Sequence, residues 1–380
     1  MSLSRRQFAL GLGALSLPSF AAAKAKQFRV YIGTYSRGES KGIYSFVLDT
    51  GAATLKPEGL AAEAENPSFL AIHPSGNYVY AVGETEKYKS ENSGSISAFK
   101  IDHATGKLQK LNDASSGGSG PCHVNVSRNG QFLVAANYNA GSCCAYEIDS
   151  TGALGKRTAF HQHSGSSVNP RQSGPHAHSV NFDRANKHVI VADLGLDKVF
   201  AYKFNAATGA MEKGTEASLK PGSGPRHFSF HPKGKFAYVI NELTCTVTAF
   251  KWNGGALTEI ETVTTLPEPW KQGYSTAEVV AHPNGRFLYG SNRGHNTIAV
   301  FQIDQATGKL KSVEHKSTLG AVPRNFAIDP TGQFLIAANQ NTNTIVLFRI
   351  NQQTGELDAV GAPIPAPVPV CVRYLQLRRA

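Results

Sequence analysis

Histidine, glutamate and arginine recur at fixed places along this chain, and together they suit acid–base chemistry on an anionic compound. Histidine and glutamate can be tuned to exchange a proton near neutral pH, whereas arginine stays charged and can bind a carboxylate, a phosphate or a developing oxyanion. One set of positions ends a run of apolar residues and reads Tyr35, Glu84, Tyr138, Leu194, Glu242, Arg293 and Gln340. A second set lies five and four residues before a turn and reads Ser68, Cys122, His178, Arg226, Ala277 and Arg324, with their neighbours Phe69, His123, Ser179, His227, Glu278 and Asn325.

The elements that must position these residues form a repeat. An apolar run, a His-Pro-x-Gly-like turn, a hydrophobic strand and a polar tip recur six times, with the turns beginning at His73, Ser127, Asp183, His231, His282 and Asp329. The intervals between these turns are 54, 56, 48, 51 and 47 residues. A period near fifty residues made of strands and turns is typical of propeller blades.

Two hydrophobic strands can be aligned after each turn. The first strands are 78–83, 132–137, 188–193, 236–241, 287–292 and 334–339, and the outer strands are 96–101, 143–148, 198–204, 246–252, 297–303 and 344–350. Residues 28–34 and 42–49 match these two strands but lack an inner strand, which the tail 368–377 can supply. We therefore predict an all-β, single-domain, seven-bladed propeller closed by N- and C-terminal strands in one blade, with six blades as the alternative.

The repeat also predicts where the polar residues meet. Antiparallel neighbours run in opposite directions, so each inner strand begins beside the end of the next strand. Both sets are therefore expected on one face, around the mouth of the central channel. Any single one of these residues could instead have a structural role, pairing with a neighbour or binding water. The concentration of polar residues at equivalent positions in several blades favours a ligand site.

The charge of the chain limits the partners. The net charge is +11, but the basic residues are scattered without a dense cluster, so we expect an anionic small molecule and no nucleic acid. The five cysteines show no metal-ligand spacing and no convincing disulfide pair. His176 with His178, and His161 with His163, lack a third ligand, so neither a metal nor another cofactor is expected. The sequence gives no indication of the oligomeric state.

The N-terminus has the pattern of an export signal. Arg5 and Arg6 precede Phe8, an apolar stretch 9–17 and three alanines at 21–23. This pattern indicates a twin-arginine signal peptide over residues 1–25, with the propeller domain over 26–380. The apolar stretch is too short to remain as a membrane anchor, so we expect a periplasmic protein that engages the twin-arginine export machinery.

Five ordered motifs resemble those of the propeller-type lactonase family, which includes the seven-bladed 6-phosphogluconolactonases and the fungal carboxy-muconate cyclases. The motifs are Gly174-Pro175-His176-Ala177-His178-Ser179, Gly224-Pro225-Arg226-His227, Asn241-Glu242-Leu243, Ala277-Glu278-Val279 and Ser291-Asn292-Arg293-Gly294-His295-Asn296. The resemblance covers essentially the whole chain after the signal and implies a seven-bladed fold and a lactone as substrate or product. It also implies a catalytic set, which comprises His178, Arg226, Glu242 and Arg293.

Lactone hydrolysis would give these residues distinct tasks. His178 or Glu242 could activate water, and Arg226 could stabilise the tetrahedral oxyanion. Arg293 and Arg324 could bind a phosphate or carboxylate on the substrate. The remaining expected substrate-binding residues are His123, His227, Glu278 and Asn325.

Three classes of function are compatible with this set: a sugar lactonase, a cycloisomerase and a non-catalytic binding protein. The family resemblance implies first a sugar lactonase of the 6-phosphogluconolactonase type. Export points instead to a periplasmic sugar lactone formed by oxidation of an aldose. A muconate-type cycloisomerase would use the same groups, and a non-catalytic ligand-binding propeller would tolerate their loss. The chain lacks a Gly-x-Ser-x-Gly nucleophile motif.

Overall fold

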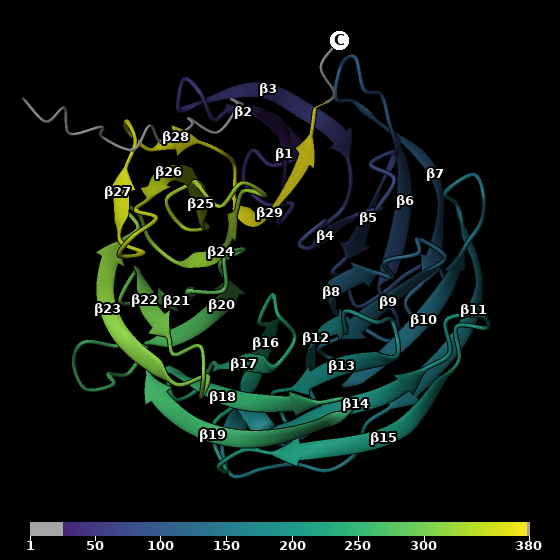
Figure 1. Cartoon of the computed structure of the whole chain (residues 1–380). Coiled ribbons are helices and arrows are strands. Elements are labelled where there is room, and N and C mark those ends of the chain that lie inside the picture. Colours follow the sequence, from purple (N-terminus) through teal and green to yellow (C-terminus); the bar gives the residue numbers. More distant parts are fainter. Residues whose placement is uncertain (1–25, 378–380) are drawn as a thin grey trace, which may run out of the picture.

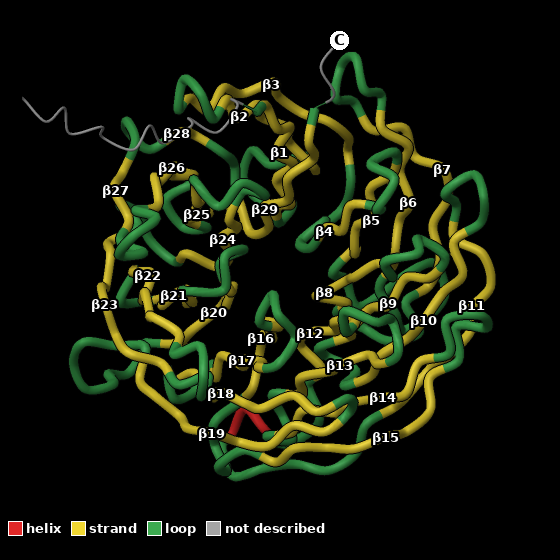
Figure 2. Tube along the Cα trace, viewed as in Figure 1, coloured by secondary structure: helices red, strands yellow, loops and turns green. Residues whose placement is uncertain are grey.

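The computed structural model describes residues 26–377, which form seven β-sheets arranged as blades around a central axis (Figure 1). Six sheets have four strands and one has five. Strands and loops make up nearly all of this part of the chain, with a single 3-10 turn, η1 (Pro170–Gln172) (Figure 2). The predicted seven-bladed propeller is confirmed.

Each blade contributes one strand to each of four concentric positions. The innermost strands are β29 (Pro369–Gln376), β4 (Leu70–Ile72), β8 (Pro121–Val126), β12 (Ala177–Phe182), β16 (Pro225–Phe230), β20 (Ser275–Ala281) and β24 (Pro323–Ile328). The second strands are β1 (Gln27–Thr34), β5 (Tyr78–Gly83), β9 (Phe132–Asn137), β13 (His188–Asp193), β17 (Phe236–Asn241), β21 (Phe287–Arg293) and β25 (Phe334–Asn339). The third strands are β2 (Gly42–Asp49), β6 (Ser95–Ile101), β10 (Ser142–Ile148), β14 (Lys198–Phe204), β18 (Thr246–Asn253), β22 (Thr297–Ile303) and β26 (Thr344–Ile350). The outermost strands are β3 (Thr54–Glu63), β7 (Leu108–Ser115), β11 (Leu154–Gln162), β15 (Met211–Ser218), β19 (Ala256–Thr264), β23 (Leu310–Ser317) and β27 (Leu357–Ala359), with β28 (Ile364–Pro365) beside β26.

The ring closes within one blade, as the split repeat predicts. Strand β29 pairs antiparallel with β1, from Phe28 opposite Gln376 to Thr34 opposite Pro369. A hydrophobic cluster joins this blade to the one before it and includes Phe28, Phe334 and Val372. This pairing covers the inner edge of β1, and the two ends of the chain are held by contacts distant in sequence.

The predicted outer strands are present as the third strands, but a fourth strand that the sequence analysis did not place lies outside each of them. Burial explains the difference. The second strand β9 is buried at every residue, whereas β15 in the outermost layer is exposed at most of its positions. A mostly exposed strand carries many polar residues, so a search for hydrophobic segments does not find it.

The recurrent turn histidines are structural. His73, His231 and His282 each place Nε2 within 2.9 Å of the carbonyl oxygen of a glycine in the next blade's turn. Tyrosine hydroxyls of the second strands also donate to glycine carbonyl oxygens, in the hairpins that join the third and fourth strands. Tyr289, for example, donates to the Gly355 oxygen at 2.7 Å. These bonds fasten adjacent blades at the face opposite the predicted site.

Register places the two polar sets on one face, which is named the site face here. Pro225 at the start of β16 pairs with Asn241 at the end of β17, and Pro323 of β24 pairs with Asn339 of β25. The residues that follow these pairs therefore meet at the same end of the channel.

No helix within residues 26–377 is long and apolar enough to cross a membrane.

Candidate active site

A β-bulge near the start of five inner strands decides where the polar side chains point. In β16, Pro225 pairs with Asn241 and His227 with Ile240, so Arg226 is an extra residue. The same shift occurs in β8, β12 and β24, where the extra residues are Cys122, His178 and Arg324, and a related one occurs in β20 between Thr276 and Val279. Consecutive side chains of a regular strand point to opposite faces, and a bulge re-aims them. Both predicted columns therefore contribute side chains to the channel.

Glu242 is the centre of the charged cluster at the site face. Its Oε2 lies 2.8 Å from Arg226 Nε and 2.9 Å from Arg293 Nη2, and its Oε1 lies 2.7 Å from Arg171 Nη2. Burial would raise the pKa of Glu242, but the three guanidinium charges outweigh it and hold that pKa well below the ordinary range. Glu242 is therefore a carboxylate whose two oxygens are both held in ion pairs.

Arg226 is buried in the channel wall, with 1% of its surface exposed. Besides Glu242, its Nη1 donates to the Ala277 carbonyl at 2.7 Å, which leaves Nη2 without a hydrogen bond to any described residue. Burial and the charges of Arg293 and Arg324 lower the pKa of Arg226 to about 10. The guanidinium stays charged at neutral pH and has donors left for a ligand.

His178 lies beside this cluster as a buried imidazole. Its Nε2 is 3.9 Å from Glu242 Oε2, and its Nδ1 is 3.6 Å from the sulfur of Cys122. Burial and the nearby Arg226 charge hold the pKa of His178 well below its ordinary value, so the ring is neutral at neutral pH. Burial also raises the pKa of the Cys122 thiol, which makes this cysteine a poor nucleophile.

A second cluster of polar residues connects His227, Glu278 and Asn325 of successive inner strands. His227 Nδ1 is 2.9 Å from Glu278 Oε1, and Asn325 donates its amide to Glu278 Oε2. Burial raises the pKa of Glu278. The rings of His123 and His178 lie 5.2 and 5.4 Å from the ring of His227, so this cluster adjoins the first.

Arg324 differs from Arg226 and Arg293 because its side chain makes no hydrogen bond or ion pair to any described residue. It lies over the ring of Tyr35 at 5.3 Å, and the hydroxyl of Tyr35 donates to Glu84 at 3.0 Å. Ser68 also donates to Glu84. Arg324 is thus a positioned cation whose donors remain available.

Two further arginines were missed by the sequence analysis. Arg171 lies on η1, between Asn169 and Gln172, which form a capping box around the turn. That Asn-Pro-x-Gln pattern was the available signal. Arg373 belongs to the closing strand β29, donates to the Leu70 carbonyl at 2.9 Å and lies over the ring of Phe69 at 4.4 Å. Its strand has no repeat turn, so its offset could not be counted.

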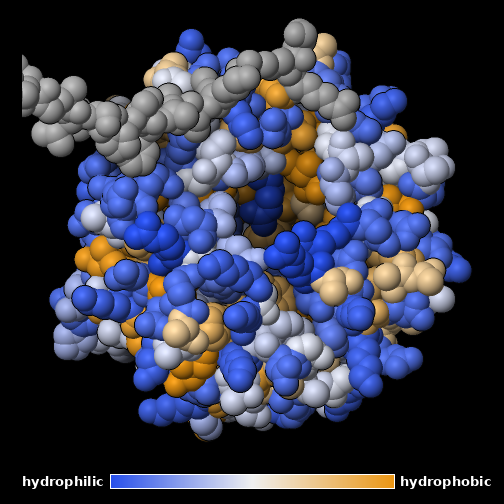
Figure 3. Space-filling view, viewed as in Figure 1, coloured by the Kyte–Doolittle hydropathy of each residue, from blue (hydrophilic) through white to orange (hydrophobic). Residues whose placement is uncertain are grey.

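The structure therefore brings the nine predicted site residues together at one end of the channel. The net charge of the side chains at this end is positive. Five arginines, at positions 171, 226, 293, 324 and 373, face three glutamates, at positions 84, 242 and 278. Even with every carboxylate ionised, an excess of two positive charges remains, which favours an anionic ligand. The space-filling view shows a hollow at the centre of the ring with hydrophilic side chains inside it (Figure 3).

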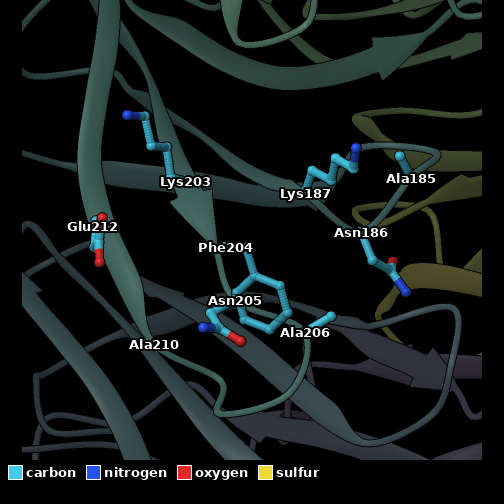
Figure 4. Close-up of a pocket in the computed structure, with 9 residues that line it drawn as sticks. All are labelled: Ala185, Asn186, Lys187, Lys203, Phe204, Asn205, Ala206, Ala210 and Glu212. Carbon is cyan, nitrogen blue, oxygen red and sulfur yellow. The ribbon is translucent and has the colours of Figure 1, made fainter.

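Pockets occur on both faces of the propeller. A pocket of about 300 Å³ adjoins the cluster at the site face and is lined in part by Arg171 and Glu242. Another, of about 470 Å³, lies at the opposite face, where Lys187, Lys203, Phe204 and Glu212 line it (Figure 4). None of the nine predicted residues lines the latter. In the described part of the chain, no three His, Cys, Asp or Glu side chains are grouped to hold a metal ion.

Comparison with known proteins agrees with this architecture. The 6-phosphogluconolactonase of Bacillus subtilis is 38% identical over 347 residues, covering 91% of this chain and 97% of the relative. A 6-phosphogluconolactonase of Formosa agariphila is 37% identical over 307 residues, covering 79% and 86%. The solved structure of the Pseudomonas aeruginosa periplasmic gluconolactonase, at 29% identity, superimposes with a TM-score of 0.87 and covers 93% of this chain and 100% of that chain.

The family assignment rests on nearly the whole described chain. Residues 29–374 match the family described as lactonase, 7-bladed beta-propeller. The match spans all seven blades, including the one that the two ends share. The chain therefore belongs to the seven-bladed β-propeller lactonase family.

Proposed function

We propose that the protein hydrolyses the 1,5-lactone of a sugar acid, with 6-phosphoglucono-1,5-lactone as the first candidate substrate. The names of the relatives support a sugar lactonase, and the observation that carries the proposal is the neutral, buried His178 beside a carboxylate held by three guanidinium groups. This arrangement places a proton acceptor, the His178 imidazole, and permanent positive charges, the guanidinium groups, at different positions in one site.

In the proposed reaction, His178 Nε2 takes a proton from water while the water oxygen bonds to the lactone carbonyl carbon. The negative charge that develops on the carbonyl oxygen is stabilised by Arg226, whose Nη2 has no other partner among the described residues. The intermediate then collapses by cleavage of the bond between the carbonyl carbon and the ring oxygen. The imidazolium returns its proton to the departing alkoxide, and the product is the open sugar acid.

The structure favours His178 over Glu242 as the base. Both oxygens of Glu242 form ion pairs with arginines, and those charges hold its pKa far below neutral. The imidazole instead has Nε2 without a hydrogen bond within the described residues. Glu242 Oε2, 3.9 Å away, would stabilise the imidazolium that forms. Glu242 is then a positioning and electrostatic residue, while His178 moves the proton.

Arg324 is the proposed anchor for an anionic substituent of the substrate. Its uncommitted guanidinium can bind a phosphate or carboxylate through two parallel hydrogen bonds. We expect wild-type protein to hydrolyse 6-phosphoglucono-1,5-lactone with a higher kcat/KM than glucono-1,5-lactone. In Arg324→Met, this preference should fall by about tenfold or more, because a charge-assisted contact contributes about 1.5–3 kcal/mol.

A pH-stat measurement of acid release, corrected for spontaneous opening, tests this proposal. Equal loss on both lactones in Arg324→Met would show that the residue supports the site without reading the phosphate. If wild-type protein accelerates neither lactone, the hydrolytic function is wrong, and muconolactone turnover or simple ligand binding should be measured next.

The pH profile tests the role of His178. Because burial and neighbouring positive charge lower its pKa, the base stays unprotonated as the solution is acidified past 6.5. We expect kcat/KM to hold level between pH 7 and pH 6 and to fall only when the pH approaches the lowered pKa. A half-maximal rate at or above pH 6.5 would contradict this assignment, since it would require an ordinary imidazole.

We also propose periplasmic location after twin-arginine export. The pattern that carries this proposal, within residues 1–25, lies outside the described residues. The Pseudomonas structure with the same fold is named a periplasmic gluconolactonase, which supports the proposal by similarity. Fractionation of cells that express the full chain tests it, since Arg5→Lys with Arg6→Lys should leave the protein in the cytoplasm.

A further inference from the structure

We propose that the pocket beside Arg171 and Glu242 is a subsite for a second sugar ring, so that the enzyme also accepts lactones of disaccharide acids. This inference rests on the proposed lactonase activity and extends its substrate class. The lactone ring would occupy the cluster around Glu242. The attached, uncharged sugar would lie in the adjoining pocket.

The pocket adjoins the proposed catalytic cluster and shares two residues with it. It lies between the loop that carries η1 and the loop before β20, and Glu242 and Arg171 form part of its wall. The two oxygens of Glu242 point to different partners: Oε2 meets Arg226 and Arg293, whereas Oε1 meets Arg171. A volume of about 300 Å³ is at the lower end for ligand pockets and suits one sugar ring.

Trp270 supplies an aromatic face in this pocket. Half of its surface is exposed, although large apolar side chains are mostly buried in this protein. Exposed aromatic residues beside a pocket are typical of ligand sites, because they can pack against the C–H groups of a sugar and still leave its hydroxyls free. Val168 and Leu319 are also exposed and lie on other loops of the site face.

The loop that carries Trp270 is held in place by its own contacts. The indole Nε1 donates to the Tyr274 carbonyl at 3.2 Å, and the hydroxyl of Tyr274 donates to Glu268 at 3.1 Å. Lys271 forms an ion pair with the same carboxylate at 2.8 Å. These contacts fix the loop before a ligand arrives, which reduces the entropy lost on binding.

The polar groups of the pocket suit hydroxyls and not a second anion. Among the described residues, the side chains of Gln272 and Ser275 make no hydrogen bond, and both line the pocket. The cation in its wall, Arg171, is already paired with Glu242. An amide, a hydroxyl and an aromatic face, without an unpaired charge, match a neutral sugar ring.

Fluorescence and kinetics together test the subsite. The chain has two tryptophans, and Trp252 packs against Phe230 at the opposite face, so Trp252→Phe leaves Trp270 as the only indole. In that variant, lactobionate should change the emission at concentrations where gluconate does not, because only lactobionate carries a second ring. Equal responses to both acids, or no response to either, would overturn the subsite.

Kinetics separate the subsite from the proposed activity. In Trp270→Ala, we expect the ratio of kcat/KM for lactobiono-1,5-lactone to that for glucono-1,5-lactone to fall by about tenfold, with the glucono-1,5-lactone rate unchanged. An unchanged ratio would refute the subsite while leaving the lactonase in place. If wild-type protein opens neither lactone, the proposed activity fails, and the fluorescence titration alone decides whether the pocket binds a sugar.

Discussion

In the Arg226→Ala variant, kcat for a sugar 1,5-lactone is expected to fall by about 10²–10³-fold, with a smaller change in KM. In the proposed mechanism, Arg226 is the buried donor that stabilises charge appearing only in the transition state, so its loss should be felt mainly in kcat. Arg226→Lys should recover only part of this rate, because an ammonium keeps the charge but not the planar pair of donors. Steady-state kinetics on glucono-1,5-lactone measure both variants.

A second buried arginine provides the matched control. Arg29 is 3% exposed, is paired with Glu58 at 2.8 Å, and reaches the hairpin oxygen of His103 at the face opposite the site. Arg29→Ala removes a buried guanidinium and its ion pair with the more exposed Glu58, without touching the cluster. We expect this variant to be less stable and to keep the wild-type kcat once folded. Equal losses of kcat in Arg29→Ala and Arg226→Ala would mean that Arg226 acts only on stability.

The Glu242→Gln variant is expected to lose about 3–5 kcal/mol in free energy of unfolding at neutral pH. The substitution keeps the shape of the side chain but removes the negative charge between Arg226, Arg293 and Arg171, so the guanidiniums repel one another within a buried site. Urea and thermal unfolding measure the change. Activity should fall as well, because the carboxylate beside His178 is lost.

The stability that Glu242 contributes should depend on pH. The pKa of Glu242 in the folded protein lies below its ordinary value of 4.5, so the ionised group contributes its full stabilisation above that value. The contribution is lost as the pH falls through the folded-state pKa. The stability difference between wild type and Glu242→Gln should therefore be constant from pH 7 to about pH 5 and shrink in stronger acid.

An exposed ion pair is the control for Glu242. Glu268 pairs with Lys271 at 2.8 Å on the surface loop before β20, where solvent screens both charges. Glu268→Gln should leave the unfolding curve unchanged. A loss in Glu242→Gln below about 1 kcal/mol would indicate that water or counter-ions, and not the carboxylate, balance the three arginines.

The blades and the composition of the main cluster could be predicted because each depends on local pattern. The hydrophobic strands and positive-φ turn residues recur at a regular period, so the middle strands appear close to where they were expected. Arg226 lies on β16 and Glu242 lies 16 residues later, directly after the adjacent strand β17, and counting from the turn was enough to pair them. The outermost strands were missed because exposed strands lack the apolar run that marks the others.

The proposal that His178, and not Glu242, is the base could not be made from residue types. Either residue can act as a base, and the difference comes from Arg171, which approaches Glu242 from a loop 71 residues earlier in the chain. Only the folded structure shows that three guanidiniums surround one carboxylate. The resulting shifts in pKa depend on burial and on distances between charges, neither of which is written in a local pattern.

The sequence by itself therefore determined the seven-bladed ring, the face that carries the candidate site and most of the charged residues there, because these follow from the strand period and from antiparallel pairing within a blade. The tertiary structure alone decided which way those residues point. The bulges at Cys122, His178, Arg226 and Arg324 turn consecutive side chains toward the channel, although regular alternation would send them apart. The closure of the ring then brings Arg373 beside Phe69, since packing joins segments that no sequence period connects.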